Sequence, residues 1–119
     1  MRAIKEIVRK YQERVYLSGF ELLFEINDAL LVIEELKQLG VPFWGLDGWM
    51  KYEDHVMQLL EVDLSIDVKA IKPEDRAQES ARIVKRYIET SLTDDTDYIS
   101  FMLYPPYGDY FNAKSFEKK

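Results

Sequence analysis

The feature that most constrains the fold is a strict alternation of apolar and polar residues from Leu60 to Val68. A period of two is the pattern of a strand with one buried face and one face in water. A strand covered on both faces would read as a continuous apolar run. Asp63 and Asp67 fall on the polar side, so we expect one face of the sheet to stay uncovered. The apolar side is predicted to consist of Leu60, Val62, Leu64, Ile66 and Val68.

Two segments show the spacing of amphipathic helices. The first is predicted over residues 27–39, with Asn27 as the capping residue and Gly40 as the stop. The second is predicted over residues 73–90, because Pro73 is tolerated in a first turn and the acids behind it favour the positive end of the helix dipole. A shorter amphipathic helix is expected within residues 1–14.

The remaining segments predict further strands and a tail. Residues 43–52 combine four aromatic residues with two glycines, which is typical of a strand or hairpin. Residues 98–104 alternate and end at a Pro-Pro pair, and residues 20–26 fit a strand, although a helix explains the same apolar positions. Residues 105–119 are expected to be a partly ordered tail. The sequence thus predicts one α+β domain, 1–119, with a mainly antiparallel sheet and helices on one face.

Composition narrows the classes of function. The chain has 119 residues, no cysteine, and 22 acidic against 16 basic side chains, for a net charge of −6. The lack of cysteine excludes thiolate zinc sites, cysteine nucleophiles and disulfides, and it suits a reducing compartment. No apolar run is long enough for a membrane span, so we expect a cytoplasmic protein. An acidic surface opposes nucleic acids and anionic membranes and favours a basic protein partner.

Catalytic and metal-binding patterns are absent from the sequence. His55 is the only histidine, and no second group stands at a spacing that would make it a base or a ligand. The acids Asp94, Asp95 and Asp97 lack the ligand spacing of a calcium loop. We therefore expect no catalytic residue, no metal and no cofactor. An enzyme that uses two convergent carboxylates remains the alternative, since a sequence does not show convergence.

The most informative stretch for binding is the aromatic segment from Phe43 to Tyr52, which is followed by the carboxylates of Glu53 and Asp54. Tryptophan and tyrosine dominate interface hot spots, and neighbouring carboxylates steer a basic partner. Strand alternation sends about half of such side chains into the protein's own core, so burial of these aromatics is the competing interpretation. The predicted partner-binding residues are Asp47, Trp49, Tyr52, Glu53 and Asp54.

Two segments resemble a known family. One runs from Leu36 to Asp47 as a helix end, a glycine and a glycine-bearing aromatic strand, and in the other the pair Tyr87-Ile88 begins seven residues after Ser80. Both are similar to the immunity protein 40 family of bacterial polymorphic toxin systems. The resemblance implies a small α+β protein that binds and neutralises a cognate toxin domain. A structural or regulatory homodimer that buries the same aromatics between copies is the alternative.

Overall fold

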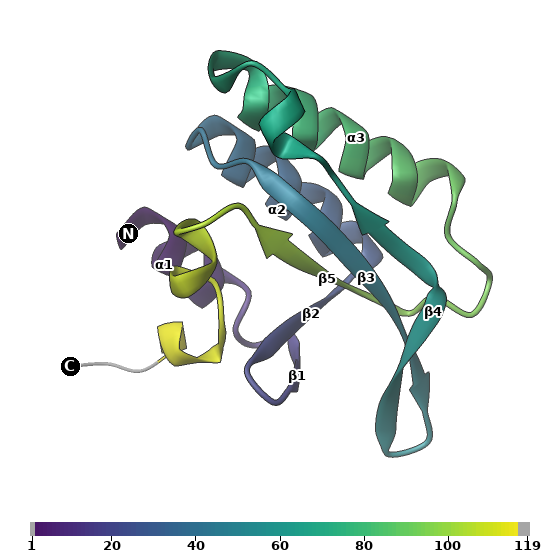
Figure 1. Cartoon of the computed structure of the whole chain (residues 1–119). Helices are drawn as coiled ribbons and strands as arrows, with labels where there is room; N and C mark the ends of the chain where they lie inside the picture. The colour runs from purple at the N-terminus through teal and green to yellow at the C-terminus, as the bar shows by residue number, and fades with distance from the viewer. Residues whose placement is uncertain (1, 117–119) are drawn as a thin grey trace.

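The computed structural model describes residues 2–116 and contains a five-stranded antiparallel sheet with three α-helices (Figure 1). The strand order is β1-β2-β5-β3-β4, and every neighbouring pair is antiparallel. The strands are β1 (Tyr16–Ser18), β2 (Glu21–Glu25), β3 (Phe43–Tyr52), β4 (His55–Ser65) and β5 (Tyr98–Leu103). The α-helices are α1 (Arg2–Lys10), α2 (Ile26–Gln38) and α3 (Arg76–Thr90). The predicted α+β class with an antiparallel sheet is confirmed.

Helices α2 and α3 lie side by side on the same face of the sheet, with α2 against β2 and β5 and α3 against β3 (Figure 1). Side chains alternate between the two faces along each strand, so every second strand side chain points toward the helices. These side chains pack against the buried faces of α2 and α3. This core includes Val32 and Leu36 of α2, Val84 and Ile88 of α3, and Leu46 and Ile99 of the sheet. Neither α2 nor α3 covers the other face of the sheet (Figure 1), which agrees with the polar side expected for the strand at 60–68.

The start of α2 differs from its prediction. The helix begins at Ile26, the capping position is Glu25, and no side chain donates or accepts a capping bond there. Strand β2 runs directly into α2, so Asn27 already lies inside the first turn and the predicted cap at Asn27 is wrong. The predicted stop is confirmed, since Gly40 follows the helix with φ +75°, a conformation that favours glycine.

The pairing of β3 with β4 is irregular in the middle, and this overturns one predicted core position. Asp47 pairs with Asp63, but the next residue, Gly48, pairs with Leu59. The three residues between Leu59 and Asp63 thus lie opposite a single step of β3, as in a β-bulge. Burial moves accordingly: Leu59 and Val62 are buried, whereas Leu60 is 87% exposed. Leu60 is not in the core because the bulge breaks the strict alternation of the sequence.

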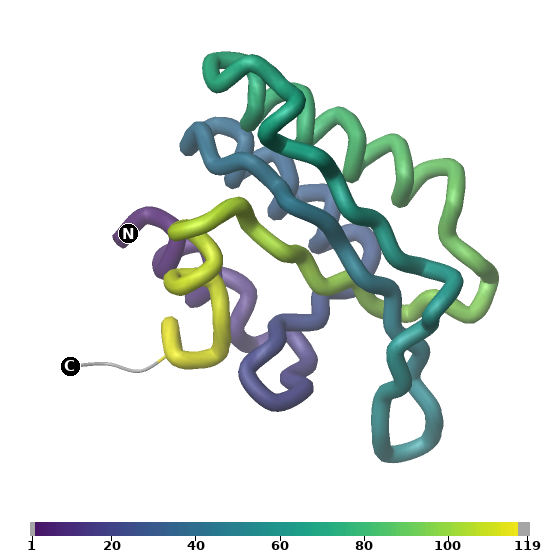
Figure 2. The backbone as a smooth tube through the Cα atoms, in the orientation of Figure 1, coloured from purple at the N-terminus to yellow at the C-terminus, as the bar shows by residue number. Residues whose placement is uncertain are grey.

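The two ends of the chain pack together beside β2. The ring of Phe24 contacts Tyr11 of the N-terminal segment and Phe111 of the C-terminal segment, with ring centroids 5.9 and 5.8 Å apart. The backbone tube shows the same proximity (Figure 2). The predicted tail is therefore ordered as far as Phe116, and residues 117–119 of it lie outside the described residues. Within residues 2–116 there are also four 3₁₀ turns: η1 (Val68–Ala70), η2 (Pro73–Asp75), η3 (Tyr107–Tyr110) and η4 (Ala113–Phe116).

Candidate protein-binding face

The sheet face opposite α2 and α3, here called the open face, carries an acidic and aromatic surface. The strand registers define its members, because residues paired across strands point to the same side. Tyr98, Ser100 and Met102 of β5 stand beside Trp49, Asp47 and Gly45 of β3. Asp47 and Trp49 in turn face Asp63 and Gln58 of β4. Alternation along β2 adds Glu21 and Glu25 at the other side of β5.

Asp47 and Asp63 form a close pair of carboxylates. The Asp63 N–H bonds to the Tyr87 hydroxyl at 3.1 Å, so it points away from β3. Asp47 and Asp63 are therefore a non-hydrogen-bonded pair, the kind in which opposite side chains approach most closely. Partial burial raises the pKa of Asp47 to about 6, aided by a hydrogen bond to Asp63 and by the negative charges of Asp63 and Glu21. A cation placed between the two carboxylates would relieve this repulsion.

Asp47 should cost stability at neutral pH. Its folded pKa of about 6 exceeds the ordinary value near 3.8. The folded state thus binds more protons, and stability falls as pH rises through this window. We expect Asp47→Asn to stabilise the protein at pH 7.5 by about 1 kcal/mol, a modest gain because water screens the charge of this partly exposed carboxylate. At pH 4 the same substitution should change the stability little. Urea midpoints at both pH values test this, with Asp54→Asn as the exposed control. An equal gain at both pH values would contradict it.

Trp49 lies on the open face but is closed off from solvent. It is 7% exposed, and its indole Nε1–H donates a 2.9 Å hydrogen bond to the Ser100 hydroxyl, Oγ. Its neighbour Tyr98 contacts the ring of Tyr16 at 5.6 Å between centroids. Trp49 and the fully buried Leu23 stand outside the main core cluster, which lies under the helices. Trp49, predicted to anchor a partner, is instead packed and hydrogen-bonded within the protein at the centre of the open face.

The other three predicted residues lie at the β3–β4 turn, which projects beyond the rest of the sheet (Figure 1). Tyr52 is 51% exposed and contacts the ring of His55, and the carboxylate of Asp54 lies 3.3 Å from His55 Nδ1. Glu53 adopts φ +53°, which is uncommon for a residue with a side chain. Tyr52 lies five positions beyond Asp47 along β3, about 16 Å at strand spacing. The structure thus places the predicted residues in two separate regions.

Comparison of the chain with models of known families, with curated proteins and with solved structures found no match. The function is therefore inferred from the geometry. Among residues 2–116, no three histidine or carboxylate side chains gather as a metal site would require. No helix in this part of the chain has the length and apolarity to cross a bilayer.

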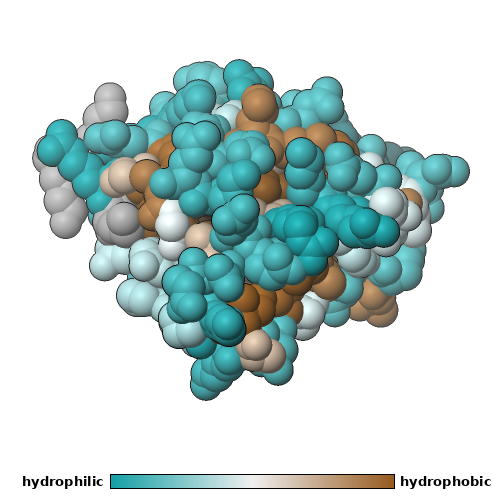
Figure 3. Space-filling view, turned by 90° about the horizontal axis from the view of Figure 1, so that it is seen from above, coloured by the Kyte–Doolittle hydropathy of each residue, from teal (hydrophilic) through white to brown (hydrophobic). Residues whose placement is uncertain are grey.

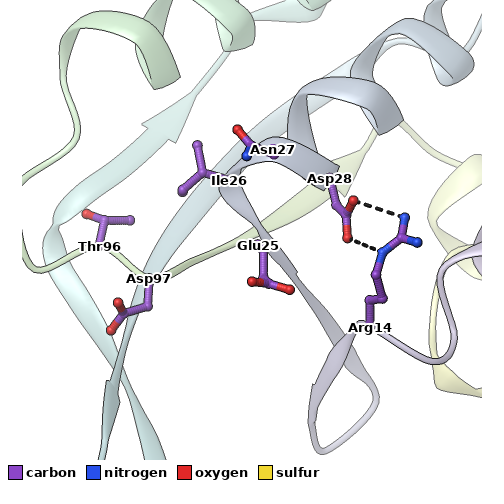
Figure 4. Close-up of a pocket in the computed structure, with 7 residues that line it drawn as sticks. All are labelled: Arg14, Glu25, Ile26, Asn27, Asp28, Thr96 and Asp97. Atoms are coloured by element: carbon purple, nitrogen blue, oxygen red, sulfur yellow. Dashed lines mark hydrogen bonds and ion pairs between the residues drawn. The ribbon is translucent and has the colours of Figure 1, made fainter.

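A cavity of about 480 Å³ lies beside the open face, where β2 enters α2. Figure 4 shows Arg14 facing Asp28, which it contacts through two hydrogen bonds of 2.8 and 3.0 Å, and Asp97 entering from the opposite side. The Asp97 carboxylate accepts a 2.7 Å bond from the Lys51 N–H. Asp28 and Asp97 are therefore both engaged in hydrogen bonds within the protein. Glu25 also lines the cavity and extends the acidic character of the open face.

Sequence reasoning found Asp47 but missed the residues that surround it. Asp63 was visible as a polar position of an alternating strand, yet its pairing with Asp47 depends on the bulge. Glu21 and Ser100 reach the open face through strand order, since β5 lies between β2 and β3. A prediction of that order from the sequence would have placed all of these residues on one face. No local motif marks them.

Proposed function

We propose that this protein is a toxin-neutralising immunity protein that binds a basic toxin domain through the open face. The observation that carries the proposal is the charge of that face. The strands place Glu21, Glu25, Asp47 and Asp63 on it, whereas Lys51 is the one basic strand residue on the same side among the described residues. Carboxylates around an aromatic centre steer and hold a basic partner.

The remaining surface supports this choice of face. Basic residues lie on α3, on the other side of the sheet, and include Arg82, Lys85 and Arg86. Helix α3 carries four basic against two acidic residues, so a basic partner is attracted more strongly to the open face than to α3. Viewed from above, hydrophilic residues cover most of the molecule, with smaller apolar patches between them (Figure 3). The segment that resembles the immunity protein 40 family also includes Asp47.

The decisive experiment is co-expression with the product of the neighbouring gene. If that product is a toxin, the protein is expected to co-purify with it and to restore growth of the host. Molar mass in solution then separates a one-to-one complex from a homodimer. Recovery of the protein alone, no rescue of growth, and turnover of a small molecule in a metabolite screen would together replace the proposal by a carboxylate-dependent enzyme.

Charge substitutions locate the binding surface. We expect Asp47→Asn with Asp63→Asn to slow association with the toxin about tenfold at low salt, because rim charges act mainly on the association rate. The same variant should weaken the salt dependence of association. The matched control, Glu53→Gln with Asp54→Gln at the β3–β4 turn, removes the same charge and should retain most of the rate. Stopped-flow measurement at several salt concentrations tests both, and a larger effect of the control would move the docking surface to the turn.

A further inference from the structure

Strand β4 forms a free edge of the sheet. Its backbone groups alternate between β3 and the outside, as antiparallel pairing requires. The Ile66 N–H donates to the Trp44 carbonyl at 2.9 Å, just beyond the strand, so Ile66 and Leu64 bond toward β3. Asp63 and Ser65 consequently direct their N–H and C=O groups outward. An edge of this kind is a template for another strand.

A side chain already occupies part of this edge. The Tyr87 hydroxyl of α3 accepts the Asp63 N–H at 3.1 Å and lies 3.5 Å from the Asp63 carbonyl oxygen, to which it donates. One hydroxyl thus serves both backbone groups that a neighbouring strand would bond. The Tyr87 hydroxyl therefore occupies the path of an added strand beside Asp63, and only there. Ser65 has no comparable bond among the described residues.

A groove of about 280 Å³ runs between this edge and α3. Its walls are apolar at Leu64 and Ile83 and basic at Arg82 and Arg86. Arg82 pairs with Glu79, whereas Arg86 has no ion-pair partner within residues 2–116. On the opposite side of the same strand, Asp63 faces the acidic open face. The two sides of the edge therefore present opposite charges to any added strand.

We propose that an extended segment of a protein partner adds to β4 beside Asp63 and Ser65 as a sixth strand, replacing the Tyr87 hydroxyl. Its side chains alternate, so those toward the groove are apolar or acidic and those toward the open face are basic. Main-chain bonds supply affinity and the alternating pockets supply specificity. A second copy fits poorly, because its own β4 would bring Glu61 and Asp63 to a face that is already acidic.

The test uses the free protein and a synthetic probe. The probe is an eight-residue peptide with lysine at odd positions and valine and glutamate in turn at even positions. Its control has the same side chains but is N-methylated at every second backbone nitrogen, which blocks strand pairing. The readout is the backbone amide spectrum and the hydrogen exchange rate of each β4 amide.

We expect the probe to shift the amides of Asp63 and Ser65 and to slow exchange at Ser65 at least tenfold at saturation, with Leu64 as the already bonded reference. Ser65→Pro should abolish binding without unfolding, because proline is tolerated at an edge position whose N–H faces solvent. Tyr87→Phe should tighten binding several-fold. If Ser65→Pro unfolds the chain, the N-methylated peptide still decides.

Two results would overturn the inference: no change along β4 at millimolar peptide, or equal binding by the N-methylated control. Equal binding would mean that the lysines adhere to the open face without strand pairing. The inference goes beyond toxin neutralisation and needs no toxin for its test. Failure with the peptide therefore leaves the co-expression result standing, and failure of co-expression leaves the peptide result standing.

Discussion

Gly48→Ala is expected to lower the free energy of unfolding by about 3 kcal/mol, at the upper end of the usual cost of overpacking. A Cβ at this position would lie 2.3 Å from Cγ1 and 2.6 Å from Cβ of Val62. Val62 is fully buried and its Cβ is fixed to the backbone, so the clash is relieved only by moving β4. Urea unfolding of the variant measures the loss.

A second variant and a control make the Gly48 result specific. Gly48→Ala combined with Val62→Ala should lose less stability than the sum of the two single changes, because the second change removes Cγ1, the nearer of the two clashing atoms of Val62. Gly108→Ala should stay within about 0.5 kcal/mol of the wild type, since its nearest contact is at 3.5 Å. A Gly48→Ala variant as stable as Gly108→Ala would show that Val62 does not lie over β3.

Trp49→Ala is expected to destabilise the free protein by about 3 to 5 kcal/mol, the usual range for a buried aromatic residue. The indole is 7% exposed and its Nε1–H is bonded to Ser100. The change leaves a cavity on the open face and a hydroxyl without its donor. This result would set Trp49 apart from an exposed interface residue, whose removal weakens a complex and leaves the free protein intact.

The hydrogen bond of Trp49 is separated from its packing by two further variants. Ser100→Ala leaves the buried indole N–H without an acceptor and should cost about 1 to 3 kcal/mol. Ser100→Ala combined with Trp49→Phe removes both partners and should cost less than the two single changes added together. Denaturant midpoints followed by circular dichroism compare the wild type, Trp49→Ala, Trp49→Phe, Ser100→Ala and the double variant. An unchanged midpoint in Trp49→Ala would mean that the indole is not packed.

The sequence allowed the regular elements to be predicted because their patterns are local. The apolar spacing of 27–39 and 73–90 defined α2 and α3, and the alternation of 98–104 defined β5. Strand β1 was missed because three residues are too few to show a period. Leu60 was misplaced because a bulge depends on pairing with β3, and no property of β4 alone reveals it.

The sequence predicted that the open face is polar and acidic, but not which residues lie on it. Alternation predicted that one side of the sheet stays polar, and composition predicted that it is acidic. Which carboxylates meet there depends on the strand order, which brings Glu21 and Asp47 to the two sides of β5. Trp49 could not be assigned from the sequence, since its burial depends on Ser100, 51 residues away.

The uncovered face of the sheet gives this protein room for evolutionary change. Asp47, Gln58 and Asp63 point away from the layer of side chains beneath α2 and α3, so substitutions among them leave most internal packing untouched. Under the proposed function, partner preference can change at these positions while the fold is retained. Trp49 is the fixed point of this surface, because its indole fills the centre of the face, and Gly48 is constrained from the other side of the sheet, where it faces the buried Val62. Under the proposed immunity function, substitutions would accumulate around these two residues, which would themselves be retained.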